Sequence, residues 1–126
     1  MQGRYSFETD AHLDLRRQVA RFSTTAIAPF SHEWDEAEEF PRALYVAASE
    51  AGVLGLGYPE ELGGTGGDAG HVLVASDELT RSGKCVGATV GLGSHGIALP
   101  PILRLGTPEQ RERFIPPVLR GEAIAA

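Results

Sequence analysis

The histidines are the side chains in this sequence best suited to metal ligation or base catalysis. His12, His32, His71 and His95 lie far apart along the chain, with no H-x-x-x-H spacing and no cysteine beside them, so the sequence predicts no metal site. Ser94 directly precedes His95, but neighbouring residues on a helix point about 100° apart and cannot act as a nucleophile–base pair. The spacing therefore predicts no catalytic residue in this chain.

Two carboxylate pairs and one cysteine complete the reactive side chains. Glu60-Glu61 and Asp77-Glu78 are expected to be solvated, because neither pair has an evident apolar pocket around it that would raise a pKa. Cys85, the single cysteine, excludes an internal disulfide and suits a reducing, cytoplasmic compartment. We interpret it as a buried structural thiol, since no base or cation cluster lies near it beyond Lys84.

Two glycine-rich segments resemble phosphate-binding loops in spacing only. Gly91 to Gly96 has the G-x-G-x-x-G pattern, which binds dinucleotides when it follows a strand and opens a helix. Here a helical pattern precedes it and Pro100 follows closely, so we do not assign a nucleotide site. The segment from Gly63 to Asp68 lacks a G-K-[ST] ending and is predicted to be a structural turn.

The stretch from Cys85 to Gly106 is apolar almost throughout and interleaved with small residues. So little polarity predicts a buried helix. Each glycine costs roughly 0.5–1 kcal/mol relative to alanine in a helix, and missing side chains let a backbone or a ligand approach closely. We therefore expect a packed helix that lines a slot, bent or ended at Pro100-Pro101.

The remaining sequence predicts helices around this stretch. Thr9 and Asp10 can cap a helix that Pro29 kinks or breaks, with a second piece running to about Glu39. Further helices follow Pro41 and Asp68, and Thr107-Pro108-Glu109-Gln110 is a capping box with proline at the first helical position. The prediction is one all-α domain over residues 1–126, an antiparallel bundle of about five to six helices.

Length and charge limit the classes of partner. A chain of 126 residues with a formal charge of −6 fits one globular domain, and the negative charge disfavours nucleic acid and anionic membranes as partners. No apolar segment of about 20 residues is free of Gly, Pro or charge, so no membrane span is predicted. The acidic segment Glu33 to Glu39 is interpreted as a solvated face.

Three segments together carry a family resemblance. FPRALYVAASEAGVLGLGYPEELGGTGGD, HVLVASDELTR and LRLGTPEQRERFIPPVLRGE resemble the N-terminal helical domain of the acyl-CoA dehydrogenases. The resemblance extends from Glu8 over nearly the whole chain. Its most specific parts are the motif from Pro59 to Gly64 and the motif from Gly106 to Arg111.

The resemblance implies a reaction as well as a fold. Family enzymes join this domain to a middle β domain and a C-terminal helical bundle, bind FAD, and oxidise the Cα–Cβ bond of an acyl-CoA thioester. They pass electrons to an electron-transfer flavoprotein or similar acceptor, and a homo-oligomer is expected. The catalytic glutamate and the main FAD ligands are expected beyond residue 126, so the 126 residues alone are not expected to be active.

The same resemblance places the wall of the acyl pocket on the glycine-rich stretch. Its acyl-facing positions would be Thr89, Val90, Gly93 and Ile97. The alternative for these four residues is ordinary helix packing. Small residues at Gly91 and Gly93 predict an enzyme that accepts long or bulky acyl chains.

Two other functions fit the same residues. One is a flavin-dependent relative, such as a nitroalkane oxidase or a monooxygenase, which would differ in the C-terminal base. The other is a non-catalytic helical module that binds a partner through the apolar face otherwise covered by the flavin-binding part.

Overall fold

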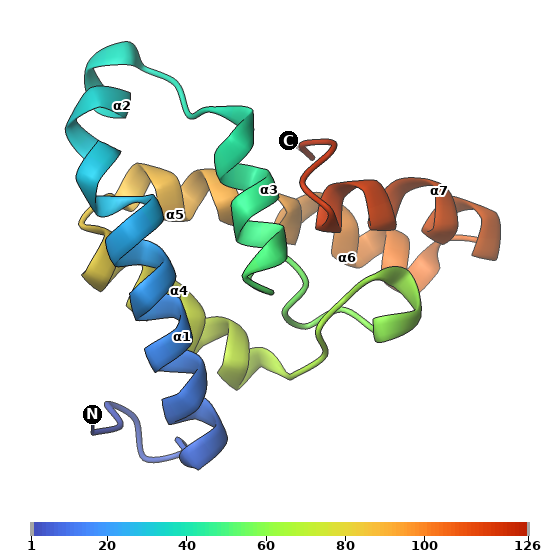
Figure 1. The fold of residues 1–126 in the computed structure, drawn as a ribbon. Coiled ribbons are helices and arrows are strands. Elements are labelled where there is room, and N and C mark those ends of the chain that lie inside the picture. Colours follow the sequence, from blue (N-terminus) through green and yellow to red (C-terminus); the bar gives the residue numbers. More distant parts are fainter. Residues whose placement is uncertain (1, 126) are drawn as a thin grey trace.

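The computed structural model describes residues 2–125, and these residues form helices joined by loops (Figure 1). Within this part of the chain the only β pairing is one isolated bridge, between Leu56 and Gly66. The all-α prediction is confirmed. Five helices have nine or more residues: α1 (Asp10–Ala26), α3 (Arg42–Glu50), α4 (Ala69–Gly83), α6 (His95–Leu105) and α7 (Pro108–Leu119). The shorter elements are the helices α2 (Ser31–Ala37) and α5 (Val86–Gly93) and the 3₁₀ turns Ala28–Phe30 and Glu60–Leu62.

Helices α1 and α4 pack side by side and run in the same direction. The ring of His12 lies 4.3 Å from that of His71, centroid to centroid, near the two helix starts. Further along, Arg16 donates to Glu78, and a Cβ added at Gly83 would lie 3.1 Å from Ile27 near the two helix ends. This pair is therefore parallel, in contrast to the antiparallel arrangement expected from the sequence, because the segment containing α2 and α3 returns the chain to the starting end.

Local signals set most helix boundaries as predicted. Thr9 is the N-cap of α1, and that helix ends at Ala26, just before the 3₁₀ turn that contains Pro29. The Thr107 hydroxyl accepts a hydrogen bond from the Gln110 amide at 3.1 Å, while the Gln110 side chain accepts one from the Thr107 amide. This reciprocal capping box begins α7 and confirms the predicted start.

The glycine-rich stretch differs from its prediction in two ways. It forms two helices that meet at Ser94, whose hydroxyl donates to the Gly91 carbonyl at 3.0 Å, and Pro100 and Pro101 lie inside α6 without ending it. The carbonyls that lose a helical partner belong to Gly96 and Ile97, which are exposed and can bond to water.

The expected burial of this stretch is wrong for most of its residues. Only Ala88, Leu92 and Leu99 are buried within α5 and α6. The large apolar residues on the other face are more than 60% exposed: Val86, Val90, Ile97 and Leu105.

The stretch Val86–Leu105 also has the length and composition of a membrane span, although only 17% of its most apolar window is buried. One such stretch is weak evidence for a span. The predicted absence of a span stays a prediction.

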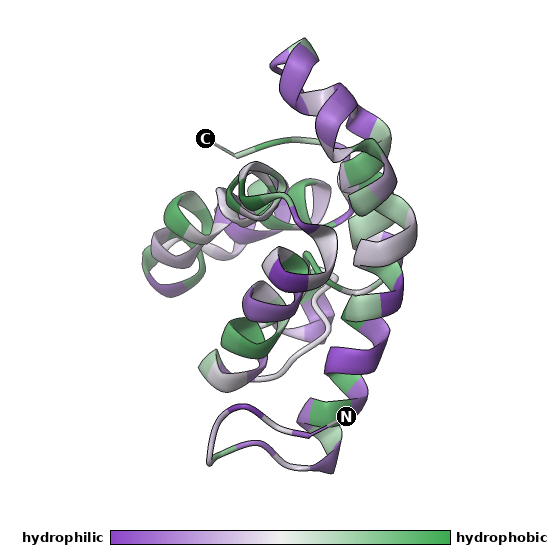
Figure 2. Cartoon of the chain, turned by 90° about the vertical axis from the view of Figure 1, so that its left-hand side faces the viewer, coloured by the Kyte–Doolittle hydropathy of each residue, from purple (hydrophilic) through white to green (hydrophobic). Residues whose placement is uncertain are grey.

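The core consists of two hydrophobic clusters. The first lies among α1, α3, α4 and α5 and includes Val19, Ile27, Leu44 and Leu79. The second joins the 58–62 loop to α6 and α7 through Tyr58, Leu62, Leu99, Ile115, Val118 and Leu119. Figure 2 shows hydrophilic and hydrophobic residues interspersed along α1 and mostly hydrophilic residues on α2. The exposure of the acidic residues there agrees with the predicted solvated face.

A buried ion cluster ties α1 to α4 and to the N-terminal segment. The Arg16 guanidinium, 1% exposed, donates to Glu8 at 2.6 Å, to Asp77 at 2.8 Å and to Glu78 at 3.2 Å. Glu78 also accepts a hydrogen bond from Ser82. The prediction that Asp77-Glu78 is solvated is therefore wrong for Glu78, which is 2% exposed. Its neutralising partner lies 62 residues away, beyond what local patterns show.

This cluster predicts acid sensitivity. Hydrogen bonds from Arg16, with further ones from the amides of Arg4 and Tyr5, lower the pKa of Glu8 from 4.5 to about 2. A depressed carboxyl pKa contributes stability above the unfolded pKa, and this contribution is lost as pH falls toward the folded pKa. We expect the free energy of unfolding, measured by urea denaturation, to fall between about pH 4.5 and pH 2, and to fall less steeply in Glu8→Gln. Equal slopes in the two proteins would contradict this assignment.

Candidate functional site: an apolar cavity between the two clusters

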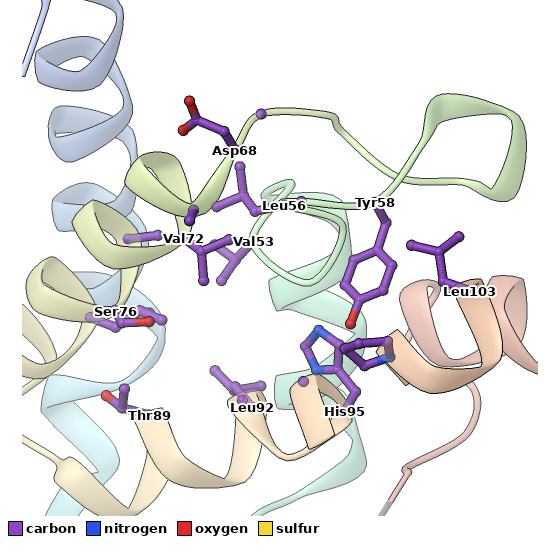
Figure 3. A pocket seen from close by; sticks show the side chains of 18 of the residues that line it. Val53, Leu56, Tyr58, Asp68, Val72, Ser76, Thr89, Leu92, His95 and Leu103 are labelled. Atoms are coloured by element: carbon purple, nitrogen blue, oxygen red, sulfur yellow. The ribbon is translucent and has the colours of Figure 1, made fainter. Parts of the chain in front are cut away.

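A cavity of about 490 Å³ lies where the two hydrophobic clusters meet (Figure 3). Its walls come from three parts of the chain, namely the segment between Val53 and Tyr58, the segment from Gly67 along α4 to Leu79, and the facing sides of α5 and α6. Most lining side chains are apolar: Val53, Leu56, Tyr58, Val72, Ala75, Leu79, Leu92, Pro100 and Leu103. A pocket of this size and lining is typical of small-molecule sites.

The structure divides the four predicted pocket residues into two pairs. Thr89 and Gly93 line the cavity, and the Thr89 hydroxyl accepts a hydrogen bond from Thr80 at 3.0 Å. Val90 and Ile97 are not among the lining residues and are 66% and 82% exposed. Thr89 and Gly93 are four residues apart and share one face of α5, whereas Val90 lies about 100° further round the helix.

The glycines also have two different roles. A Cβ added at Gly93 or Gly96 would meet no atom within 4 Å, and both residues line the cavity. A Cβ at Gly91 would lie 3.3 Å from the Tyr45 hydroxyl and 3.4 Å from Phe40. Gly91 therefore allows close packing and does not widen the cavity, in contrast to its predicted role. Gly96, which is not among the predicted pocket positions, does face the open space.

Two polar rings form one end of the cavity. Figure 3 shows the side chains of Tyr58 and His95 directed toward each other, with ring centroids 5.7 Å apart. The His95 Nε2–H donates to the Leu54 carbonyl at 3.0 Å. Burial lowers the pKa of His95 and raises that of Tyr58, so both groups are held neutral at pH 7. Neither residue stood out as a wall residue in the sequence, because the contact joins positions 37 residues apart.

The same geometry explains why Ser94 and His95 are not a catalytic pair. The Ser94 hydroxyl lies 3.0 Å from the Gly91 carbonyl and 2.9 Å from that of Ala125, while His95 bonds to Leu54. The G-x-G-x-x-G pattern likewise falls across the junction of two helices. Among the described residues, the lining of the cavity is therefore mostly apolar, with the charged side chains of Asp68 and Arg104 also in its wall.

Comparisons with known proteins add an independent observation. The sequence model of the family described as "Acyl-CoA dehydrogenase, N-terminal domain" matches residues 9–122. This match covers most of the chain. The chain belongs to the acyl-CoA dehydrogenase family.

The individual relatives agree with this membership. The long-chain specific acyl-CoA dehydrogenase of rat mitochondria is 36% identical over 91% of this chain, and the benzylmalonyl-CoA dehydrogenase of Aromatoleum aromaticum is 35% identical over 94%. A crystal structure of an acyl-CoA dehydrogenase homologue from Mycobacterium smegmatis, 36% identical, superposes with a TM-score of 0.89 over 95% of this chain.

These relatives are much longer than the matched region. The chain spans 26% of the rat enzyme, 31% of the Aromatoleum enzyme and 32% of the mycobacterial chain. The match corresponds to the N-terminal part of the acyl-CoA dehydrogenase fold, which confirms the family resemblance seen in the sequence.

Proposed function

We propose that this chain acts as the N-terminal domain of an FAD-dependent acyl-CoA dehydrogenase, and that the cavity between its two clusters holds part of the acyl chain. The observation that carries the proposal is the pair Gly93 and Gly96, which leave open space on the cavity side of α5 and α6. A glycine within a helix lowers the stability of that helix. The cost is understandable where the space beside the glycine holds a bound group instead of a neighbouring side chain.

The residues of this chain would bind and orient the substrate and exclude water. Apolar side chains from α4, α5 and α6 supply a dry surface, and the neutral Tyr58 and His95 close one end without placing a charge beside it. When bound, FAD would supply the hydride acceptor, and the family resemblance assigns its main ligands and the catalytic glutamate to parts of the fold outside these 126 residues. An electron-transfer flavoprotein or similar acceptor would then reoxidise the flavin.

The proposed experiment enlarges position 93 stepwise in the complete enzyme. We expect the enzyme to use palmitoyl-CoA at least as well as butyryl-CoA, and the series Gly93→Ala, Gly93→Val, Gly93→Phe to reduce kcat/KM for palmitoyl-CoA progressively. The phenylalanine variant should lose the pocket contacts to several methylene groups of the acyl chain. This loss corresponds to a decrease in kcat/KM for palmitoyl-CoA of about tenfold or more. Activity on butyryl-CoA should change by less than about threefold, because a short chain does not reach the blocked part.

Position 91 gives a matched control for position 93. Gly91→Ala also adds a methyl group to α5, but it does so against Phe40 and Tyr45 instead of the cavity. It should leave the ratio of the two activities unchanged, because the added methyl group does not narrow the cavity. A strong preference of the unmodified enzyme for butyryl-CoA, or equal loss on both substrates in the Gly93 series, would contradict the proposed acyl slot.

The exposed side of α5 and α6 distinguishes a domain of a larger enzyme from a separate binding module. Val86, Val90, Ile97 and Leu105 form an exposed apolar row, which in the proposed enzyme is covered by the rest of the polypeptide or by another subunit. The purified 126-residue chain should therefore self-associate in sedimentation experiments, and Val90→Lys with Ile97→Lys should reduce this association. A chain that stays monomeric at high concentration would argue against a covered face.

A further inference from the structure

His12 has a ring nitrogen that no protein group satisfies. The residue is 8% exposed, and its Nδ1 accepts a hydrogen bond from the Thr9 amide at 3.0 Å and lies 2.9 Å from the Thr9 hydroxyl. Its Nε2 is buried and has no hydrogen-bond partner. A buried polar atom without a partner costs free energy, so its retention calls for a ligand.

Two other potential ligands converge on this nitrogen from the start of α4. A Cβ at Gly70 would lie 3.5 Å from His12 Nε2 and 3.1 Å from Asp68 Oδ1, so both atoms face the same side of Gly70. The His71 Nδ1 lies 2.9 Å from Asp68 Oδ1, and the three ligand atoms offered by His12, Asp68 and His71 are all within 4.8 Å of one another. The parallel packing of α1 and α4 creates this cluster from residues 56 and more positions apart.

We propose that His12, Asp68 and His71 form a binding site for a divalent metal ion of the Zn²⁺ class at the paired starts of α1 and α4. Two imidazoles and one carboxylate are a ligand set that Zn²⁺ accepts, with water at the fourth position. His12 and His71, which are far apart in the sequence, are brought together only by the fold.

Binding requires two local adjustments that the surroundings allow. The ligand atoms must approach to about 3.4 Å, which follows from bonds of about 2.1 Å in a tetrahedral site. The Asp68 and His71 side chains are 77% and 28% exposed and can move inward, whereas buried His12 stays fixed. For Nε2 to bind the ion, the proton of His12 must move to Nδ1 and point to the Thr9 hydroxyl, the type of outer contact that orients metal-bound histidines, and the hydrogen bond that the Thr9 amide donates to Nδ1 must be given up.

An ion held there would connect α1 to the start of α4. It would fix the cap of α4 at Asp68 against α1, next to the part of the cavity wall formed by Gly67, Asp68 and Ala69. Because the ion binds the folded chain through residues that unfolding separates, it would raise the free energy of unfolding.

The test is a titration of the 126-residue chain with Zn²⁺ in metal-free buffer, followed by calorimetry, with Co²⁺ as a spectroscopic probe of coordination. We expect one ion per chain, a Kd of about 10 µM or tighter, and a higher unfolding temperature with Zn²⁺. Each of His12→Ala, His71→Ala and Asp68→Asn should weaken binding by about tenfold or more.

His32 provides the control, because it is an exposed histidine on α2. His32→Ala should leave the affinity within about twofold. His71→Ala tests the site at a partly exposed position, so its result stands even if His12→Ala fails to fold. The proposal is overturned if the chain binds no ion stoichiometrically, if His71→Ala and Asp68→Asn bind as tightly as the unmodified chain, or if His32→Ala loses as much affinity as they do.

Discussion

Arg16→Ala is expected to lower the free energy of unfolding by about 3–5 kcal/mol, the usual cost of removing one partner of a buried ion pair. The substitution leaves Glu8 and Glu78 with side chains 1% and 3% exposed, and Asp77 close beside them, without their shared cation. Arg4 is 3.6 Å from Asp77 but 45% exposed, so it cannot replace the buried guanidinium. Chemical denaturation monitored by circular dichroism measures the effect.

The adjacent arginine supplies the matched control for this prediction. Arg17 pairs with Asp14 at 2.6 Å, but the two side chains are 49% and 74% exposed. Exposed pairs contribute little, so Arg17→Ala should change stability by less than about 0.5 kcal/mol. Similar losses in the two variants would show that the buried cluster contributes no more than a surface ion pair.

Gly64→Ala is expected to destabilise the chain by about 3 kcal/mol, at the upper end of the cost of overpacking. An added Cβ would overlap the Tyr58 carbonyl and lie 2.8 Å from the Pro59 carbonyl oxygen, and backbone atoms cannot rotate away. The same loop is held by hydrogen bonds from the Gly64 amide to Pro59 at 2.9 Å and from the Gly66 amide to Tyr58 at 3.0 Å. Displacing these carbonyls therefore breaks the loop and shifts Tyr58 in the cavity wall.

Gly96→Ala makes the same chemical change where there is room for it. No atom lies within 4 Å of a Cβ at Gly96, which is inside α6, so alanine should stabilise the chain by about 0.5–1 kcal/mol through helix propensity. The two variants should thus differ in sign when compared by thermal or urea unfolding. A destabilising Gly96→Ala, or a neutral Gly64→Ala, would contradict the geometry described for these positions.

Local chemistry explains which parts of the fold could be predicted from the sequence. The capping box at Thr107, the cap at Thr9 and the break near Pro29 depend on residues within one helical turn, and all three are found in the structure. The parallel pairing of α1 with α4 depends on contacts about 60 residues apart, such as that between Arg16 and Glu78. Periodicity shows which face of a helix is apolar, but not which other helix covers it.

The candidate site shows the same limit. The sequence indicated a slot beside the glycine-rich stretch, and Gly93 and Thr89 do line the cavity. Assigning a role to each glycine required its neighbours, because Gly91 faces Phe40 and Tyr45 while Gly96 faces open space. Tyr58 and His95 carried no signal of their own, since their position depends on the loop that brings Leu54 to His95.

The position of the cavity has a consequence for how the chain unfolds. Its walls belong to both hydrophobic clusters, so a molecule bound inside would touch both clusters. Such a molecule would keep its full set of contacts only while both clusters are folded. Occupancy would therefore add a coupling free energy between the two clusters. We expect a filled cavity to make the two clusters unfold together, because the occupant then forms part of the core.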